Sequence, residues 1–276
     1  TVLMVLAAIF APLLAPQNPF NPAELRLMDA FAPPGTEAIS GEMVYWLGAD
    51  GQGRDVFSAI LYGSRISLLV GVSAVLFAMI LGTGLGLYAG YRGGWPDAII
   101  MRVVDVQLTF PSILVALLIF GVVSNVMPAG DRAQAALLVL VVSIGLSDWV
   151  HYARTVRGAT MVEKTKEYVQ AGHVIGLPAR TILARHVLPN VMRPVLVIAT
   201  IGLALAIIAE ATLSFLGVGM PPTQPSLGTL IRVGQDYMFS GEWWITFFPS
   251  LALLALALSV NLLGDWLRDV LNPKLR

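Results

Sequence analysis

Long apolar runs alternate with short polar segments along the whole chain. A transmembrane helix needs about 20 mostly apolar residues, and six runs bounded by Gly, Pro or charged residues come close to this length. The runs cover residues 2–15, 66–89, 108–127, 135–150, 194–216 and 245–263. This pattern predicts an all-α integral membrane protein with six transmembrane helices.

The polar segments divide the chain into four predicted stretches. The chain begins with Thr1 inside an apolar run, so we expect part of the first helix to be missing. A cleaved signal peptide is the alternative, but no basic segment precedes this run and no small-x-small cleavage site follows it. The stretches are a first transmembrane helix at 1–15, an extracytoplasmic segment at 16–65, a transmembrane core at 66–265 that includes a cytosolic loop at 151–193, and a cytosolic tail at 266–276.

Composition supports the membrane prediction and narrows the chemistry. The chain is 57% hydrophobic and 12% charged, with a mean hydropathy of +0.77, which leaves too little polar surface for a soluble globule. It has no cysteine, so neither a disulfide nor a thiolate metal site can form within it. Its formal net charge is zero, which argues against a nucleic-acid partner.

Basic residues gather on one side of the predicted helices. If the N-terminus is cytoplasmic, most of the 17 Lys and Arg residues fall in cytoplasmic segments, and most of the acids fall in the opposite ones. Because basic loops are retained in the cytoplasm, we expect both termini to be cytoplasmic. The stretch from Arg154 to Arg193 is especially basic and lies on this side.

That basic stretch has the pattern of a helix, a turn and a second helix outside the bilayer. "KEYVQAGHVIGL" is compatible with a helix, "LPAR" breaks it, and "ARTILARHVL" resumes it until Pro189, which is expected to end it. Gly172 and Gly176 are four residues apart, which on a helix makes a strip without side chains. The segment suggests a docking surface, whereas the plainer interpretation is a loop that only carries topology charge.

The same segment resembles the "EAA" loop of ABC transporter permeases, whose pattern is E-A-A-x3-G-x9-I-x-L-P. Gln170-Ala171-Gly172, Gly176 and the run from His186 to Pro189 fit its spacing, with Gln170 in place of Glu and His186 in place of Ile. The form "RHVLPN" is typical of the branch of this family that transports dipeptides, oligopeptides and nickel. Within that branch it resembles the second of the two permease subunits. The segments "WLGADGQGRDVFSAILYGSRISL", "RVVDVQLTFPSILVALLI" and "AEATLSFLGVGMPPTQPSLGTLI" also resemble this branch, with Ala49 for Thr and Ala59 for Arg in the first.

This resemblance implies a fold, partners and a site. The fold is the type I ABC importer permease fold, in a bacterial inner membrane. The partners are a homologous second permease, two ATPase subunits, an extracytoplasmic solute-binding protein and membrane lipid. The substrate is most readily a di- or oligopeptide, while nickel, glutathione and other small solutes remain alternatives. The residues expected to couple to the ATPases are Glu167, Gln170, Ala171, Gly172, Gly176, Leu177, Arg180, Arg185, His186 and Pro189.

Catalytic and cofactor motifs are missing from the sequence. It contains no G-x-x-x-x-G-K-[ST] phosphate loop, no G-x-S-x-G elbow and no H-E-x-x-H zinc motif. We therefore expect no enzyme activity and no bound cofactor in this chain, with ATP and Mg²⁺ held by partner ATPases. His151, His173 and His186 lack neighbouring carboxylate or Cys ligands, so no metal site is predicted.

Glu210 is the one acid well inside an apolar run. A carboxylate at the centre of a membrane helix costs about 2.5–3.5 kcal/mol on insertion scales, so it should face the bundle interior or a wet cavity. Two roles stay open: a residue of the translocation path, or a hydrogen-bonded structural group. An ion-coupled secondary transporter that uses Glu210 is the rival function, although no internal repeat or broken midplane helix is evident.

Three smaller patterns predict local structure. Gly82, Gly86 and Gly90 form a G-x-x-x-G-x-x-x-G run, which favours close packing against a neighbouring helix over a role in a pore. The acids and the arginine of "GADGQGRDV" are expected to cap or pair locally where the chain enters the bilayer. Pro111 stands where a helix can begin.

Overall fold

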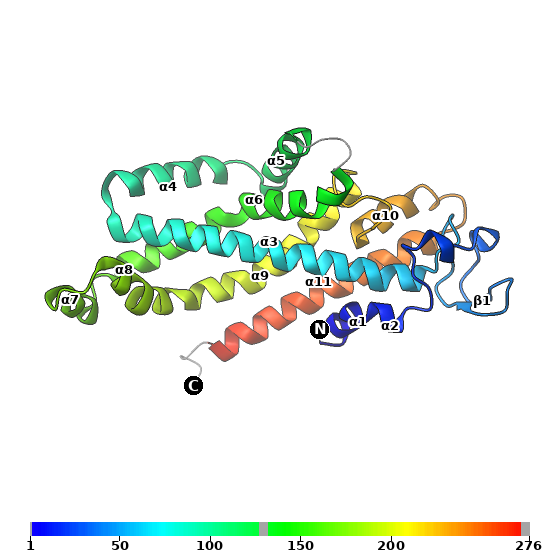
Figure 1. Ribbon diagram of the computed structural model, residues 1–276, viewed down its shortest axis with the longest axis horizontal. Helices are drawn as coiled ribbons and strands as arrows, with labels where there is room; N and C mark the ends of the chain where they lie inside the picture. The colour runs from blue at the N-terminus through cyan, green and yellow to red at the C-terminus, as the bar shows by residue number, and fades with distance from the viewer. Residues whose placement is uncertain (1, 127–131, 272–276) are drawn as a thin grey trace.

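The protein is an elongated bundle of helices. The computed structural model describes residues 2–126 and 132–271 (Figure 1). Thr1, Met127 at the end of one predicted run, and residues 272–276 of the predicted tail lie outside them. The longest helices run side by side along the long axis: α3 (Val56–Arg92), α6 (Arg132–Glu163), α9 (Leu188–Phe215) and α11 (Trp244–Leu271).

These four helices are long and apolar enough to cross a membrane, with α9 counted together with the turns before it from Ala179. They confirm the predicted runs at 66–89, 135–150, 194–216 and 245–263, and each helix extends beyond its run. Two further helices, α4 (Gly94–Leu108) and α5 (Ser112–Val126), form a bent pair. If this pair counts as one span, the described residues contain up to five. The membrane helix bundle is therefore confirmed, whereas the sixth span is not reproduced within the described part of the chain.

The predicted run at 108–127 begins at a break between helices. α4 and α5 meet at an angle of 102° across the segment Thr109 to Pro111. A proline disfavours helical geometry in the residue before it, so α4 ends at Leu108, before Phe110, and Pro111 stands directly ahead of α5. Leu114 and Val115 donate their backbone N–H groups to the Pro111 carbonyl, at 3.0 and 3.3 Å, which confirms that a helix begins there.

The first apolar run forms two short helices, α1 (Val2–Ile9) and α2 (Ala11–Leu14), in place of one long one. Pro12 lies in the first turn of α2. A proline cannot donate the backbone hydrogen bond that would continue the preceding helix, so the break at Phe10 follows from the sequence.

The segment before α3 is held by local polar contacts. Two short 3₁₀ turns, η1 (Pro22–Glu24) and η2 (Leu27–Asp29), lead into a small antiparallel ribbon of β1 (Thr36–Glu37) and β2 (Val44–Tyr45). The Asp55 carboxylate then caps α3 by accepting from the Ser58 backbone N–H at 2.8 Å, and burial raises the pKa of Asp55. The Arg54 guanidinium pairs with buried Asp50 at 2.7 Å. The predicted cap and ion pair are confirmed, but they start the helix at Val56 and not at Ile66.

The glycine run of α3 packs directly against the α6 backbone. A Cβ added at Gly82, Gly86 or Gly90 would stand 2.4–2.7 Å from the carbonyl oxygen of Trp149, Ala153 or Arg157, respectively. No real side chain fits at such a distance, so these three positions let the two backbones touch along three turns. The predicted close packing is confirmed.

A Gly86→Ala substitution should therefore push α3 away from α6. We expect the free energy of unfolding to fall by about 1–3 kcal/mol, the usual cost of overpacking, as measured by denaturant titration in detergent. Gly84→Ala is the matched control on the same helix, because nothing lies within 4 Å of its added Cβ. Equal stability of the two variants would contradict the role of the glycine contact.

Candidate functional site

A helical hairpin projects at the end of the bundle that is opposite the β1–β2 ribbon (Figure 1). It consists of α7 (Glu167–Val174), a turn, the short helix α8 (Ala179–Thr181) and the π-helical segment η3 (Ile182–Val187), which leads without a break into α9. We call residues 167–187 the hairpin. The predicted helix, turn and helix are therefore present. The helix before them, α6, continues to Glu163, beyond Val150 where its predicted apolar run ends.

Gly176 makes the turn and is not part of a helical strip. Its φ of +79° lies in the left-handed region that favours glycine. The N–H of Gly176 donates to the His173 carbonyl, and that of Leu177 to the Gly172 carbonyl, both at 3.0 Å. This bond pair is the Schellman cap that ends α7. The predicted side-chain-free strip from Gly172 to Gly176 is therefore wrong, because the helix ends between them.

Pro189 does not end the second helix as the sequence predicts. It lies in the first turn of α9, directly after η3. A proline inside a helix clashes with the carbonyl four residues earlier, and a π-type turn changes the position of that carbonyl. The wider turn at Ile182–Val187 therefore lets the hairpin continue as one rod into the membrane-crossing helix.

The hairpin is packed firmly onto the bundle. Val169, Ile182 and Val187 are fully buried and share one apolar cluster with Val150 and Val156 of α6. Two polar contacts reach the end of α3. The Lys164 ammonium donates to the Gly90 carbonyl at 2.8 Å, and the Tyr91 hydroxyl lies 3.3 Å from His173 Nε2. The hairpin is therefore packed against α6 and linked to the end of α3.

The outer face of the hairpin carries the residues that the sequence singled out. Gly172 is buried, and Leu177 and His186 are half-buried. The rest are exposed: Glu167, Gln170, Ala171, Gly176, Arg180, Arg185 and Pro189. Sequence reasoning missed two side chains at the tip, Val174 and Ile175, which are 86% and 72% exposed. Apolar residues that face solvent beside exposed arginines are typical of a contact surface.

Tyr168 links the base of the hairpin to the neighbouring helices by hydrogen bonds. Its hydroxyl donates to the Glu163 carboxylate and accepts from the Asn190 side-chain amide at 2.9 Å. Partial burial, together with the neighbouring Glu163 carboxylate, raises the pKa of Tyr168. The ring therefore stays a neutral hydrogen-bonded link between α6, α7 and α9.

Glu210 lies in a buried polar cluster. It is 0% exposed, and its carboxylate accepts hydrogen bonds from the hydroxyls of Ser67 and Ser214, both at 2.7 Å. Ser67 also accepts from the backbone N–H of Leu227 at 3.3 Å, at the start of α10 (Leu227–Gln235). Glu210 thus ties α9 to α3 and α10, and it does not line the large cavity described next. The geometry matches the structural role and gives no support to a place in the translocation path.

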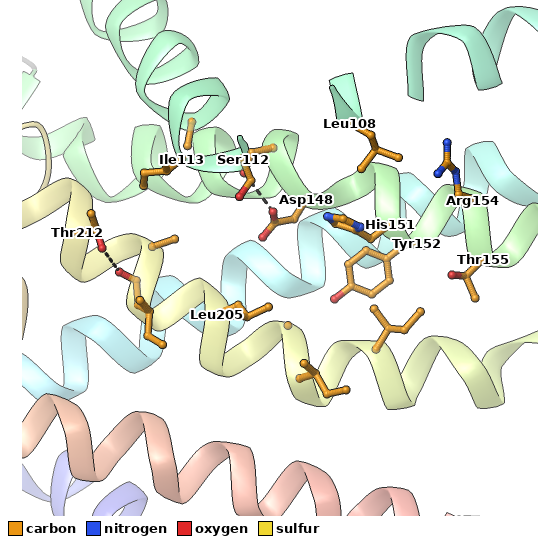
Figure 2. A pocket seen from close by; sticks show the side chains of 17 residues that line it. Leu108, Ser112, Ile113, Asp148, His151, Tyr152, Arg154, Thr155, Leu205 and Thr212 are labelled. Carbon is orange, nitrogen blue, oxygen red and sulfur yellow. Dashed lines mark hydrogen bonds between the residues drawn. The ribbon is translucent and has the colours of Figure 1, made fainter. Parts of the chain in front are cut away.

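A cavity of about 940 Å³ opens between α4, α5, α6 and α9 (Figure 2). Its wall on α9 is mostly apolar, and its wall on α6 carries Asp148, His151, Tyr152 and Thr155. No local pattern in the sequence indicates this cavity. Among the described residues no group of three or more His, Asp or Glu side chains is placed to hold a metal ion.

The chain combines an apolar helix bundle, a hairpin at one end and a cavity between α4, α5, α6 and α9. The family of binding-protein-dependent transport system inner membrane components matches residues 82–276, which include the hairpin and the cavity. The chain belongs to this family.

Peptide permeases from several bacteria are similar in sequence to most or all of this chain. It is 38% identical to the dipeptide transport system permease protein DppC of Haemophilus influenzae, covering 100% of this chain and 88% of the relative. It is 41% identical to the glutathione transport system permease protein GsiD of Pectobacterium atrosepticum, covering 84% and 73%. It is also 34% identical to the oligopeptide transport system permease protein OppC of Bacillus subtilis, covering 100% and 83%. The family resemblance expected from the four sequence segments is confirmed.

Solved structures share the fold. A chain of the inward-facing MetNI methionine ABC transporter matches with a TM-score of 0.58 and 20% identity, over 78% of this chain and 97% of that one. A chain of an amino acid ABC transporter matches with a TM-score of 0.55 and 12% identity, over 77% and 94%. The bundle therefore has the fold of ABC importer permeases.

Removal of the buried carboxylate should destabilise the fold. In Glu210→Ala the hydroxyls of Ser67 and Ser214 lose their acceptor, so we expect the free energy of unfolding to fall by about 1–3 kcal/mol. Thr212→Ala is the control on the same helix, because its exposed hydroxyl bonds only to the Ile208 carbonyl. Thermal unfolding in detergent compares them, and a Glu210→Ala variant as stable as the control would contradict the structural role.

Proposed function

We propose that this chain is the permease subunit of an ATP-driven, binding-protein-dependent importer for di- and oligopeptides. The observation that carries the proposal is the hairpin, whose exposed tip at Val174 and Ile175 stands at one end of a bundle with a permease fold. The relatives are named as permeases for dipeptides, oligopeptides and glutathione. Two of these three names specify peptides, and glutathione is itself a small peptide.

In this proposal the chain forms half of the translocation pathway and has several partners. A homologous permease forms the other half, two ATPase subunits dock on the hairpins, and a solute-binding protein delivers the substrate from the opposite side. ATP and Mg²⁺ are bound by the ATPases, so this chain is not itself catalytic. The concentration of basic residues around the hairpin supports a cytosolic position for it and for both termini, in a bacterial inner membrane.

The contacts of the hairpin supply a physical route for coupling. The buried side chains Val169, Ile182 and Val187 join it to α6 and α9, and its His173 contacts the Tyr91 hydroxyl at the end of α3. When ATP closes the ATPase pair, a docked hairpin moves as a lever and carries these helices with it. The bundle then switches between an inward and an outward opening, which requires two stable arrangements.

The rival function is ion-coupled secondary transport with Glu210 as the coupling residue. The position of Glu210 weighs against it, because the carboxylate is fully buried and satisfied by two hydroxyls. Peptide uptake that needs an ion gradient but no ATP, and that Glu210→Gln abolishes, would favour this rival.

Changes at the outer face of the hairpin should uncouple transport from ATP hydrolysis. In the reconstituted complex, Arg185→Glu and Ile175→Asp should lower ATP-driven peptide uptake by about tenfold or more, within the range of a coupling free energy of ~1–3 kcal/mol. Gly176→Val should act alike, because a β-branched residue cannot adopt the φ of +79° without strain. Uptake and ATP hydrolysis are measured on the same vesicles.

Arg102→Glu is the matched control for charge. Arg102 is an exposed residue of α4 that lies outside the hairpin, so its reversal should leave uptake unchanged. Normal uptake in all three hairpin variants, with ATP hydrolysis still coupled, would show that the hairpin is not the docking element.

A further inference from the structure

One face of α6 carries polar chemistry that the fold does not use. Asp148, His151, Tyr152 and Thr155 line the cavity, and spacings of three and four residues place them on one side of a helix. Figure 2 shows the side chains of Asp148, His151 and Tyr152 directed into the space between α6 and α9. Asp148, His151 and Thr155 therefore line the cavity, whereas Tyr152 lines it and also packs in the apolar core with residues of α3 and α9.

The Tyr152 hydroxyl is buried and has no partner. Tyr152 is 2% exposed, and within the described residues its hydroxyl makes no hydrogen bond. It lies against Gly202 of α9, where an added Cβ would stand 2.8 Å from the hydroxyl oxygen. A buried polar group left unpaired costs about 1–3 kcal/mol. A bound molecule that reached this hydroxyl would therefore stabilise the site, and because the oxygen is closed to solvent the site must open slightly to admit it.

Asp148 is a half-buried acid of α6, near the end of the apolar run at 135–150. It lies roughly 20 Å along the helix from either end of Ala135–Glu163. Among the described residues it accepts a hydrogen bond from the Ser147 hydroxyl at 3.3 Å, and it belongs to none of the ion pairs found there. The cavity's Arg154 is instead paired with Asp105. An acid at this depth is expensive unless it faces water or a cation, and the cavity provides room for either.

The rest of the cavity suits a small peptide. Its volume of about 940 Å³ lies at the upper end of the range of about 300–1,000 Å³ that is usual for ligand pockets. The opposite wall on α9 is built from Ile198, Ile201, Leu205 and Ile208, which offer apolar surface without polar groups that would select one side chain. Most polar side chains of the cavity are thus on the α6 wall, and Ser112 of α5 and Thr212 of α9 are the others.

We propose that the α6 wall is a binding subsite for the free amino end of a small peptide. The Asp148 carboxylate accepts hydrogen bonds from the peptide ammonium group, and the Tyr152 hydroxyl donates to a carbonyl oxygen of the same peptide. The backbone ends are thereby recognised, while the side chains rest against the apolar α9 wall. The inference rests on the proposed peptide import, and it adds which part of the peptide the permease contacts.

The test measures protection of a thiol in the cavity. This chain has no cysteine, so Thr155→Cys places its only thiol on the cavity wall. A complex that contains the chain without this substitution measures how much label the cysteines of the partner subunits take up. The importer is purified without its binding protein, and its alkylation by a small maleimide is timed with Ala-Ala or N-acetyl-Ala-Ala at millimolar concentration.

The free dipeptide should slow alkylation roughly threefold or more, the effect of one ion pair near a partly wet cavity, and the acetylated peptide should not. The protection should disappear when Asp148→Asn is added and weaken with Tyr152→Phe. Asp265→Asn is the matched control, because this exposed acid of α11 does not line the cavity.

Three results would overturn the subsite: no protection by the free dipeptide, equal protection by both peptides, or full protection with Asp148→Asn. A separate measurement of ATP-driven peptide uptake by the complete importer shows whether only the subsite is wrong or the proposed function is wrong as well. Uptake that persists means that the subsite alone is wrong, and a wild-type complex without ATP-driven peptide uptake contradicts the proposed function itself.

Discussion

The close crossing of α3 and α6 is the constraint on which the rest of the structure depends. Gly82, Gly86 and Gly90 bring the two backbones into contact, and in a lipid environment such van der Waals contact is what holds helices together. The same crossing places the polar face of α6 toward α9. These glycines thus hold in place the helix α6, which lines the cavity and leads toward the hairpin, and the Gly90 carbonyl also accepts a hydrogen bond from Lys164.

The hairpin and the cavity are two ends of one connected body. α6 passes along the cavity wall at Asp148 and ends at Glu163, where the hairpin begins. α9 begins in the hairpin and then forms the opposite wall. Both cavity walls therefore lie on helices that adjoin the hairpin. In the proposed function, this continuity is the physical route by which a docked hairpin would act on the cavity.

Features that depend on local sequence were predictable, and those that depend on tertiary contacts were not. Hydrophobic runs located the long helices, and the spacing of Gly82, Gly86 and Gly90 indicated their packing. The role of Gly176 was misjudged because helix continuity, not spacing, decides whether two glycines share a face. Pro189 continues a helix because η3 widens the preceding turn. The cavity is lined by residues of α6 and α9 that are far apart in the sequence, so no local pattern indicates it.

The central claim is that this chain works as a permease inside an ATP-driven assembly. The most direct measurement is affinity purification from the native membrane in mild detergent, followed by mass-spectrometric identification of the proteins that accompany it. The account predicts one or two ATPases with a phosphate-binding loop, together with a second, homologous permease. A chain recovered alone or as a homo-oligomer that still transports peptide without ATP would contradict it.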